Sequence, residues 1–65
     1  MKLNDLAPVL ASAPGRIQDA LLYERSMENY LLAAPIEHVI RKWPDFDVEN
    51  IRAAGDKLII CGYIR

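Results

Sequence analysis

The chain has 65 residues, a single cysteine and nearly balanced charges, and these features exclude several classes of protein. We expect one small domain over residues 1–65 without an internal disulfide, because Cys61 has no second cysteine to pair with. Eight lysine and arginine residues face nine aspartate and glutamate residues, so the formal charge of -1 offers no basic excess for nucleic acid or an anionic membrane.

The sequence shows no feature typical of an exported or membrane-spanning chain. The N-terminus carries Asp5 early and lacks a long apolar stretch. No run approaches the roughly 18 apolar residues of a transmembrane helix. Together with the lone cysteine, these observations predict a cytoplasmic protein without a membrane partner.

The first expected element is a short helix over residues 3–12. Apolar side chains recur there at the helical spacing, namely Leu3, Leu6, Ala7 and Leu10. We expect the helix to end just before Pro14, which cannot continue it, and Gly15, which permits a left-handed turn.

The segment 16–34 is compatible with two structures. As a hairpin, it has strands 17–24 and 30–34 joined by the polar loop 25–29. A helix is favoured by the alanine, leucine, glutamate and methionine content of the segment. The absence of glycine in loop 25–29 also weakens the hairpin interpretation. We favour the hairpin, and the helix remains the alternative.

A second helix is predicted from Pro35 to the residue before Pro44. Its apolar residues again follow the helical spacing, namely Ile36, Val39, Ile40 and Trp43. Proline suits the first helical position, and Pro44 ends the helix.

The C-terminal third is predicted to be a second hairpin, with strands 47–53 and 57–64. Gly55 supplies the positive φ that the turn needs, and the odd separation of Val48 and Ile51 predicts a bulge. The second strand is apolar on both faces, with Leu58, Ile60 and Ile64 on one and Ile59, Cys61 and Tyr63 on the other. We therefore expect it to be central, with Gly62 marking a bulge or a close backbone approach.

The expected fold class is α+β, a small antiparallel sheet of two hairpins with two short helices packed on it. A strand that is apolar on both faces needs cover on both of them. Two short helices packed on one side of the sheet cover only one face. We therefore expect self-association through the sheet, with Ile59 and Tyr63 in the interface.

We expect no catalytic residue, no cofactor and no metal site. Cys61 lies in an apolar strand, where a thiol is structural rather than reactive. His38 is expected on the second helix away from its apolar stripe. The acids Asp45, Asp47 and Glu49 alternate as calcium ligands do, but they lack the EF-hand pattern and are interpreted as a solvated loop.

The aromatic residues are the best candidates for a protein-binding surface, because tyrosine and tryptophan are frequent at interface hot spots. Trp43 and Phe46 flank Pro44 and Asp45 at the end of the predicted helix, so they are the best candidates for exposed anchors. The candidate protein-binding residues are Trp43, Phe46, Tyr63 and Ile59.

The order of these features resembles the very short accessory proteins of phages and prophages of Gram-positive bacteria. The resemblance runs from the Leu3-x-x-Leu6 helix through the proline-glycine turn to segments 47–51 and 55–60. The chain departs from the pattern at 25–29, which lacks a glycine- or aspartate-rich turn. The resemblance implies a non-enzymatic accessory factor, and such factors often bind one host protein, sometimes an immune effector.

The leading interpretation is a non-enzymatic protein-binding module, a phage-encoded inhibitor of a host defence protein in its sharpest form. One alternative is a small nucleic-acid-binding regulator that gathers its basic residues on one side, namely Arg41, Lys42, Arg52, Lys57 and Arg65. Another alternative is a self-assembling structural subunit. The expected partners are a host or phage protein and a second copy of the chain, and not nucleic acid.

Overall fold

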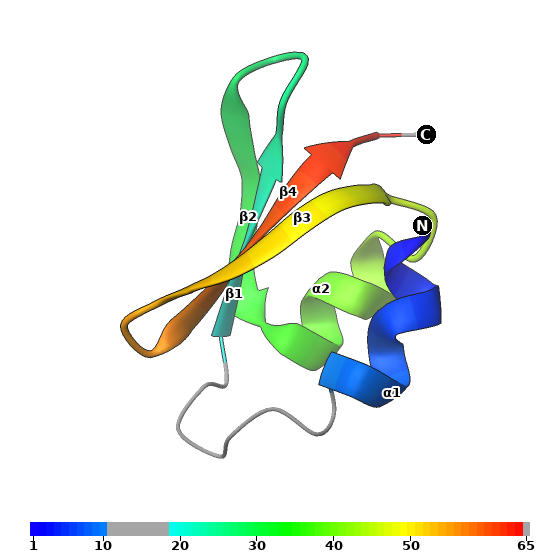
Figure 1. The fold of residues 1–65 in the computed structure, drawn as a ribbon, viewed down its shortest axis with the longest axis vertical. Coiled ribbons are helices and arrows are strands. Elements are labelled where there is room, and N and C mark those ends of the chain that lie inside the picture. Colours follow the sequence, from blue (N-terminus) through cyan, green and yellow to red (C-terminus); the bar gives the residue numbers. More distant parts are fainter. Residues whose placement is uncertain (11–18, 65) are drawn as a thin grey trace.

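The computed structural model describes residues 1–10 and 19–64, which form an α+β fold with two short helical segments packed against a four-stranded sheet (Figure 1). The element order is η1 (Leu3–Leu6), α1 (Ala7–Leu10), β1 (Asp19–Glu24), β2 (Asn29–Pro35), α2 (Ile36–Lys42), β3 (Asp47–Ala54) and β4 (Lys57–Tyr63). The expected class, both hairpins and the packing of helices on the sheet are therefore confirmed. The expected helix end at residues 12–15 lies outside the described residues.

The strand order is β2-β1-β4-β3, and the sheet is mixed. Each hairpin is antiparallel, but β1 and β4 pair in parallel, with Asp19 opposite Lys57 and Glu24 opposite Gly62. The expectation of a purely antiparallel sheet was wrong. The reason is the crossover through α2, which returns the chain along the sheet so that β4 runs in the direction of β1.

The hairpin, and not the helix, occupies residues 19–35, which include all of segment 16–34 that the structure describes. Its strand β1 buries Ala20 and Leu22 on one face, the alternation that a half-covered strand requires. The turn between β1 and β2 forms without glycine because Glu28 adopts φ 51°, a backbone conformation that residues other than Gly, Asn and Asp rarely take. The absence of glycine therefore did not forbid the turn.

Helix α2 begins one residue later than expected. Pro35 is the last residue of β2 and the N-cap of the helix, with φ -53° and ψ 145°. Its ring fixes φ near -65°, which suits both the strand end and the approach to a helix, and its extended ψ keeps it outside the helix. At the other end, the Trp43 amide donates to the Val39 carbonyl oxygen at 3.0 Å and closes the last turn.

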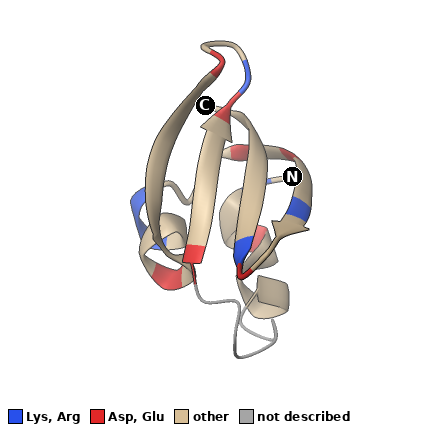
Figure 2. Ribbon diagram, turned by 90° about the vertical axis from the view of Figure 1, so that its left-hand side faces the viewer, with Lys and Arg blue, Asp and Glu red and all other residues tan. Residues whose placement is uncertain are grey.

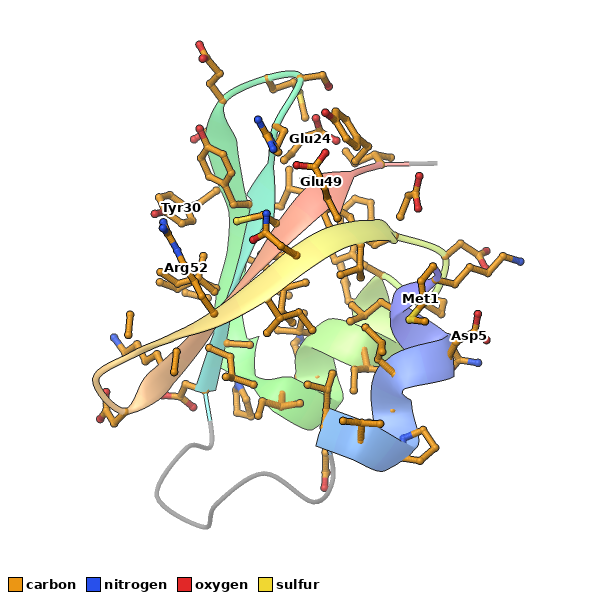
Figure 3. All side chains as sticks on the ribbon, viewed as in Figure 1. Met1, Asp5, Glu24, Tyr30, Glu49 and Arg52 are labelled. Atoms are coloured by element: carbon orange, nitrogen blue, oxygen red, sulfur yellow. The ribbon has the colours of Figure 1, made fainter. Side chains whose placement is uncertain are left out.

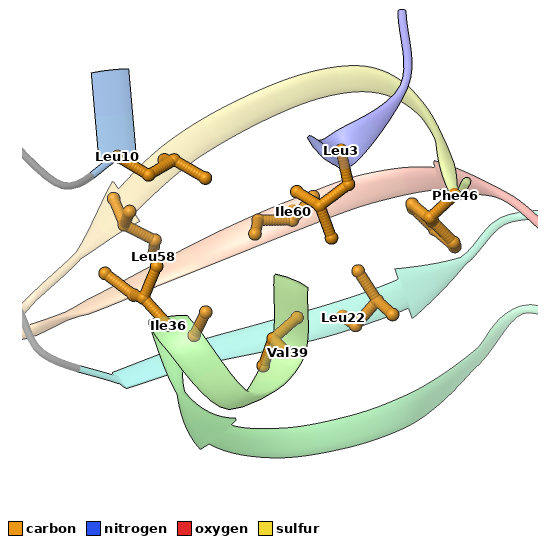
Figure 4. Packing of buried hydrophobic residues seen from close by; sticks show 9 residues of the cluster. Leu3, Leu10, Leu22, Ile36, Val39, Phe46, Leu58 and Ile60 are labelled. Carbon is orange, nitrogen blue, oxygen red and sulfur yellow. The ribbon is translucent and has the colours of Figure 1, made fainter. Parts of the chain in front are cut away.

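The hydrophobic core lies on one face of the sheet, between the strands and the helices (Figure 4). Its buried members are Leu3, Leu10, Ala20, Leu22, Ile36, Val39, Phe46, Leu58 and Ile60. The two central strands supply Ala20, Leu22, Leu58 and Ile60, so the expected central position of the last strand is confirmed. Burial of each larger apolar side chain contributes about 1.5–3 kcal/mol, which makes this face the main source of stability.

Gly62 marks a close backbone approach, as the sequence predicted. A Cβ atom at this position would lie 2.0 Å from the Asp47 carbonyl oxygen and 2.9 Å from Cε2 of Phe46. The expected bulge is also present, between Val48 and Asn50 on the paired strand β3. Gly55 adopts φ 65° in the turn, as expected.

We predict that Gly62→Ala lowers the free energy of unfolding by about 2 kcal/mol, because the added methyl group must displace the backbone of Asp47. Denaturant titration measures the change. Gly55→Ala is the matched control: nothing lies within 4 Å of its Cβ position, so only its positive φ is penalised, by about 1 kcal/mol. A larger loss at Gly55 than at Gly62 would contradict the steric argument.

Candidate functional site: the open face of the sheet

Both helical segments lie on the same side of the sheet, and no described element covers the other side (Figure 2). We call that side the open face. Side chains alternate along each strand, and the strand pairing places Leu21, Tyr23, Tyr30, Ala33, Asn50, Arg52, Ile59, Cys61 and Tyr63 there. Figure 3 shows Tyr30 and Arg52 projecting on this side, away from the helices.

The open face is aromatic and aliphatic at its centre. Leu21, Tyr23 and Ile59 are half-buried by their neighbours in the sheet, whereas Tyr30 is 52% and Tyr63 38% exposed. The rings of Tyr23 and Tyr30 meet edge to face, with centroids 5.1 Å apart. Such pairs favour each other beyond their buried area, which holds both rings in place on adjacent strands.

A depression of about 310 Å³ lies on the open face. It is lined by Tyr23, Arg25, Glu28, Asn50, Arg52 and Cys61, so it runs from the β1–β2 turn across the two central strands to β3. The Arg25 guanidinium forms an ion pair with Glu49 of β3. Within residues 1–10 and 19–64, the side chains of Glu28 and Arg52 have no ion-pair or hydrogen-bond partner. The depression thus presents one unpaired negative and one unpaired positive charge.

Two of the four candidate binding residues lie on the open face, as expected, and two do not. Ile59 and Tyr63 are on it. Phe46 is only 1% exposed, so its expected role as an exposed anchor was wrong: its ring packs into the core beside Gly62. Trp43 is half-buried against the core on the helical side.

Three residues of the open face were missed at the sequence level, namely Tyr23, Tyr30 and Arg52. The signal for the tyrosines was their place in the two strands of the first hairpin, where residues of one face recur at every second position. Arg52 was noted only as one of several basic residues. Its neighbours on the face depend on the pairing of β3 with β4, which places it opposite Ile59.

The basic residues do not gather on one side. Arg41 and Lys42 lie at the end of α2 on the helical side, whereas Arg52 and Lys57 share the side-chain alternation of the open face. Arg65 lies outside the described residues. No observation of charge distribution therefore favours the nucleic-acid alternative.

The alternating acids were interpreted as a loop, but only Asp45 lies in the loop after α2, whereas Asp47 and Glu49 belong to the edge strand β3. Each has its own cationic neighbour. Asp45 lies 3.6 Å from the Lys2 ammonium, Asp47 lies 3.2 Å from the N-terminal ammonium, and Glu49 pairs with Arg25. Within the part of the chain that the structure describes, no three potential metal ligands come together. His38 is exposed on α2.

Cys61 forms part of the floor of the depression and is only 8% exposed. Attack on a reagent requires an accessible thiolate, and the surrounding strand atoms restrict access. We predict that a thiol reagent labels the native protein slowly and the denaturant-unfolded protein quickly, as followed by absorbance. Rapid stoichiometric labelling of the native protein would show that the depression opens to Cys61.

Glu24 is a buried carboxylate, 1% exposed, at the end of β1. It lies beside the β1–β2 turn, which borders the depression. Its Oε1 accepts hydrogen bonds from the Ser26 hydroxyl, from the Ser26 amide at 2.6 Å and from the Met27 amide at 3.4 Å, while Oε2 accepts one from the Ile64 amide. The Ser26 hydroxyl lowers the pKa of Glu24, burial opposes this by raising it, and the backbone amides add to the lowering, so the net pKa lies below its ordinary value. Glu24 thereby ties the β1–β2 turn to the end of β4.

This network predicts acid sensitivity. Because the pKa of Glu24 is lower in the folded protein than in the unfolded chain, its stabilisation is present above the ordinary glutamate pKa of 4.5 and is lost as the pH falls through the folded value. Glu24→Gln should destabilise the protein at neutral pH, since an amide cannot accept all these bonds, and should flatten the fall in stability with acid. Thermal unfolding across pH measures both effects. Glu37→Gln, at an exposed helical position, is the control, and an equal effect there would exclude the network as the cause.

Comparison of the chain with protein-family models, with curated proteins and with solved structures gives no match. Among the described helices, none is long and apolar enough to cross a membrane. The assignment of function therefore depends on the open face itself.

Proposed function

We propose that the chain is a non-enzymatic protein-binding module and that the open face is its binding surface. The observation that carries the proposal is an aromatic and aliphatic sheet face that no described element of the chain covers. An apolar face of this kind on a small protein is typical of a contact surface for another polypeptide.

The composition of the face suits a protein partner. Tyrosine and arginine are enriched where binding energy concentrates, and Tyr23, Tyr30, Tyr63 and Arg52 are all on this face. Charges are sparse on three of the four strands: central strand β1 has them only at its ends, central strand β4 only at Lys57, and edge strand β2 has none. A low charge density keeps the desolvation cost of burying such a surface small.

The target class that we propose is a protein of a bacterial host. Its support is the resemblance in segment order to phage and prophage accessory proteins, which often act by binding one host protein. An inhibitor of this kind needs only a surface that occupies its target, and a rigid sheet face provides one at little entropic cost.

Affinity capture with matched variants tests the proposal. Immobilised wild-type protein is expected to retain a discrete protein from a Gram-positive bacterial lysate, and Tyr30→Ala should weaken the purified interaction by about thirtyfold, the effect of losing a hot-spot tyrosine. Tyr30 is half exposed, so its truncation should leave the fold intact, which circular dichroism checks. His38→Ala, exposed on the helical side, is the control. Loss of binding with His38→Ala and not with Tyr30→Ala would place the site elsewhere.

A further inference from the structure

The unpaired charges of the depression sit on opposite parts of the open face. Glu28 belongs to the turn that joins β1 and β2, whereas Arg52 lies on β3 at the far edge of the sheet. Tyr23 and Cys61, on the two central strands, lie between them and line the same depression. Each charge faces the depression, yet the two do not pair with each other.

This arrangement is complementary to itself. In a two-fold symmetric contact, a residue i that meets residue j of the second copy is matched by j meeting i. An axis in the plane of the face, midway between Glu28 and Arg52, would bring Glu28 of each copy opposite Arg52 of the other. The same axis would pass over Tyr23 and Cys61 and stack the apolar centres of the two faces.

We infer that the open face binds a second copy of this chain, face to face, with two reciprocal Glu28–Arg52 ion pairs flanking a centre formed by Leu21, Tyr23, Ile59 and Cys61. The contact pairs both charges and covers the apolar centre without any further protein. The expected cover of Ile59 and Tyr63 by self-association has the same geometric origin.

The small area of the face indicates a weak dimer. Strands spaced about 4.8 Å apart and about 20 Å long give a four-stranded face of roughly 400 Å² in projection. Standard interfaces bury about 800 Å² per partner, and smaller ones are weak or transient. The dimer should therefore dissociate in the micromolar range, so that a tighter-binding target can displace the second copy.

The inference rests on the proposed function in one respect, because both assign binding to the open face. The second copy would then occupy the face in the absence of the target, and target binding would compete with dimerisation. Their tests are separate: dimerisation is measured on the purified chain alone, whereas the proposed function is tested by capture from a lysate. A chain that stays monomeric would not contradict the proposed function, and a failed capture would not contradict dimerisation.

Charge reversal tests the inference by analytical ultracentrifugation of the purified full chain across the micromolar range. Arg52→Glu places like charges opposite each other at two sites and should weaken the dimer about tenfold or more, as should Glu28→Arg. The double variant Glu28→Arg with Arg52→Glu restores opposite charges and should recover most of the wild-type affinity. Recovery in the double variant excludes unfolding as the cause of the single losses.

Arg41→Glu is the matched control, since it makes the same chemical change at an exposed position on the helical side. It should leave the dimer unchanged. A wild-type chain that stays monomeric throughout the micromolar range would overturn the inference. So would a dimer that is equally insensitive to Arg52→Glu and Arg41→Glu, because that dimer would use another surface.

Discussion

Two short helical segments can cover only one face of a four-stranded sheet, and this limit organises the molecule. The helices meet the strands on one side and bury Leu3, Val39 and Phe46 against Leu22 and Ile60. The other side is left with side chains that are apolar but uncovered. The same chain thus has one face that stabilises the fold and one whose chemistry suits contact with another polypeptide.

Local patterns predicted the elements well, because each depends on residues close in sequence. The spacing of Ile36, Val39 and Ile40 fixed the position of α2 to within a residue or two, and the odd spacing of Val48 and Ile51 correctly indicated a bulge. The parallel pairing of β1 with β4 was missed, because it joins segments almost forty positions apart and no local pattern encodes which edges meet.

The candidate site was predicted in part for the same reason. The alternation within the last strand placed Ile59 and Tyr63 on one face, and that face is the open one. Phe46 was misplaced, because a residue after a helix stop can turn inward or outward; here Gly62, far along the chain, leaves room for its ring. The burial of Glu24 could not be predicted either, since one of its partners, the Ile64 amide, lies 40 positions further along the chain.

The depression combines a strained turn with an exposed apolar surface. Glu28 holds a positive φ that glycine or asparagine would adopt at lower cost. Arg52 is exposed and hydrated, so it is free to pair with a charge that a second polypeptide brings. Binding of another polypeptide would also remove the apolar surface of the open face from water.

The pairing of β1 with β4 also bears on the order in which the chain acquires structure. During synthesis, the first hairpin and α2 emerge before β4 exists, so one edge of β1 stays without its neighbour until the final strand is made. An isolated two-stranded hairpin is marginally stable in water, and closing a contact over so long a loop is slow relative to local turns. The fourth strand of the sheet is thus inserted between the first and the third, and cooperative folding of the sheet waits until β4 has been made.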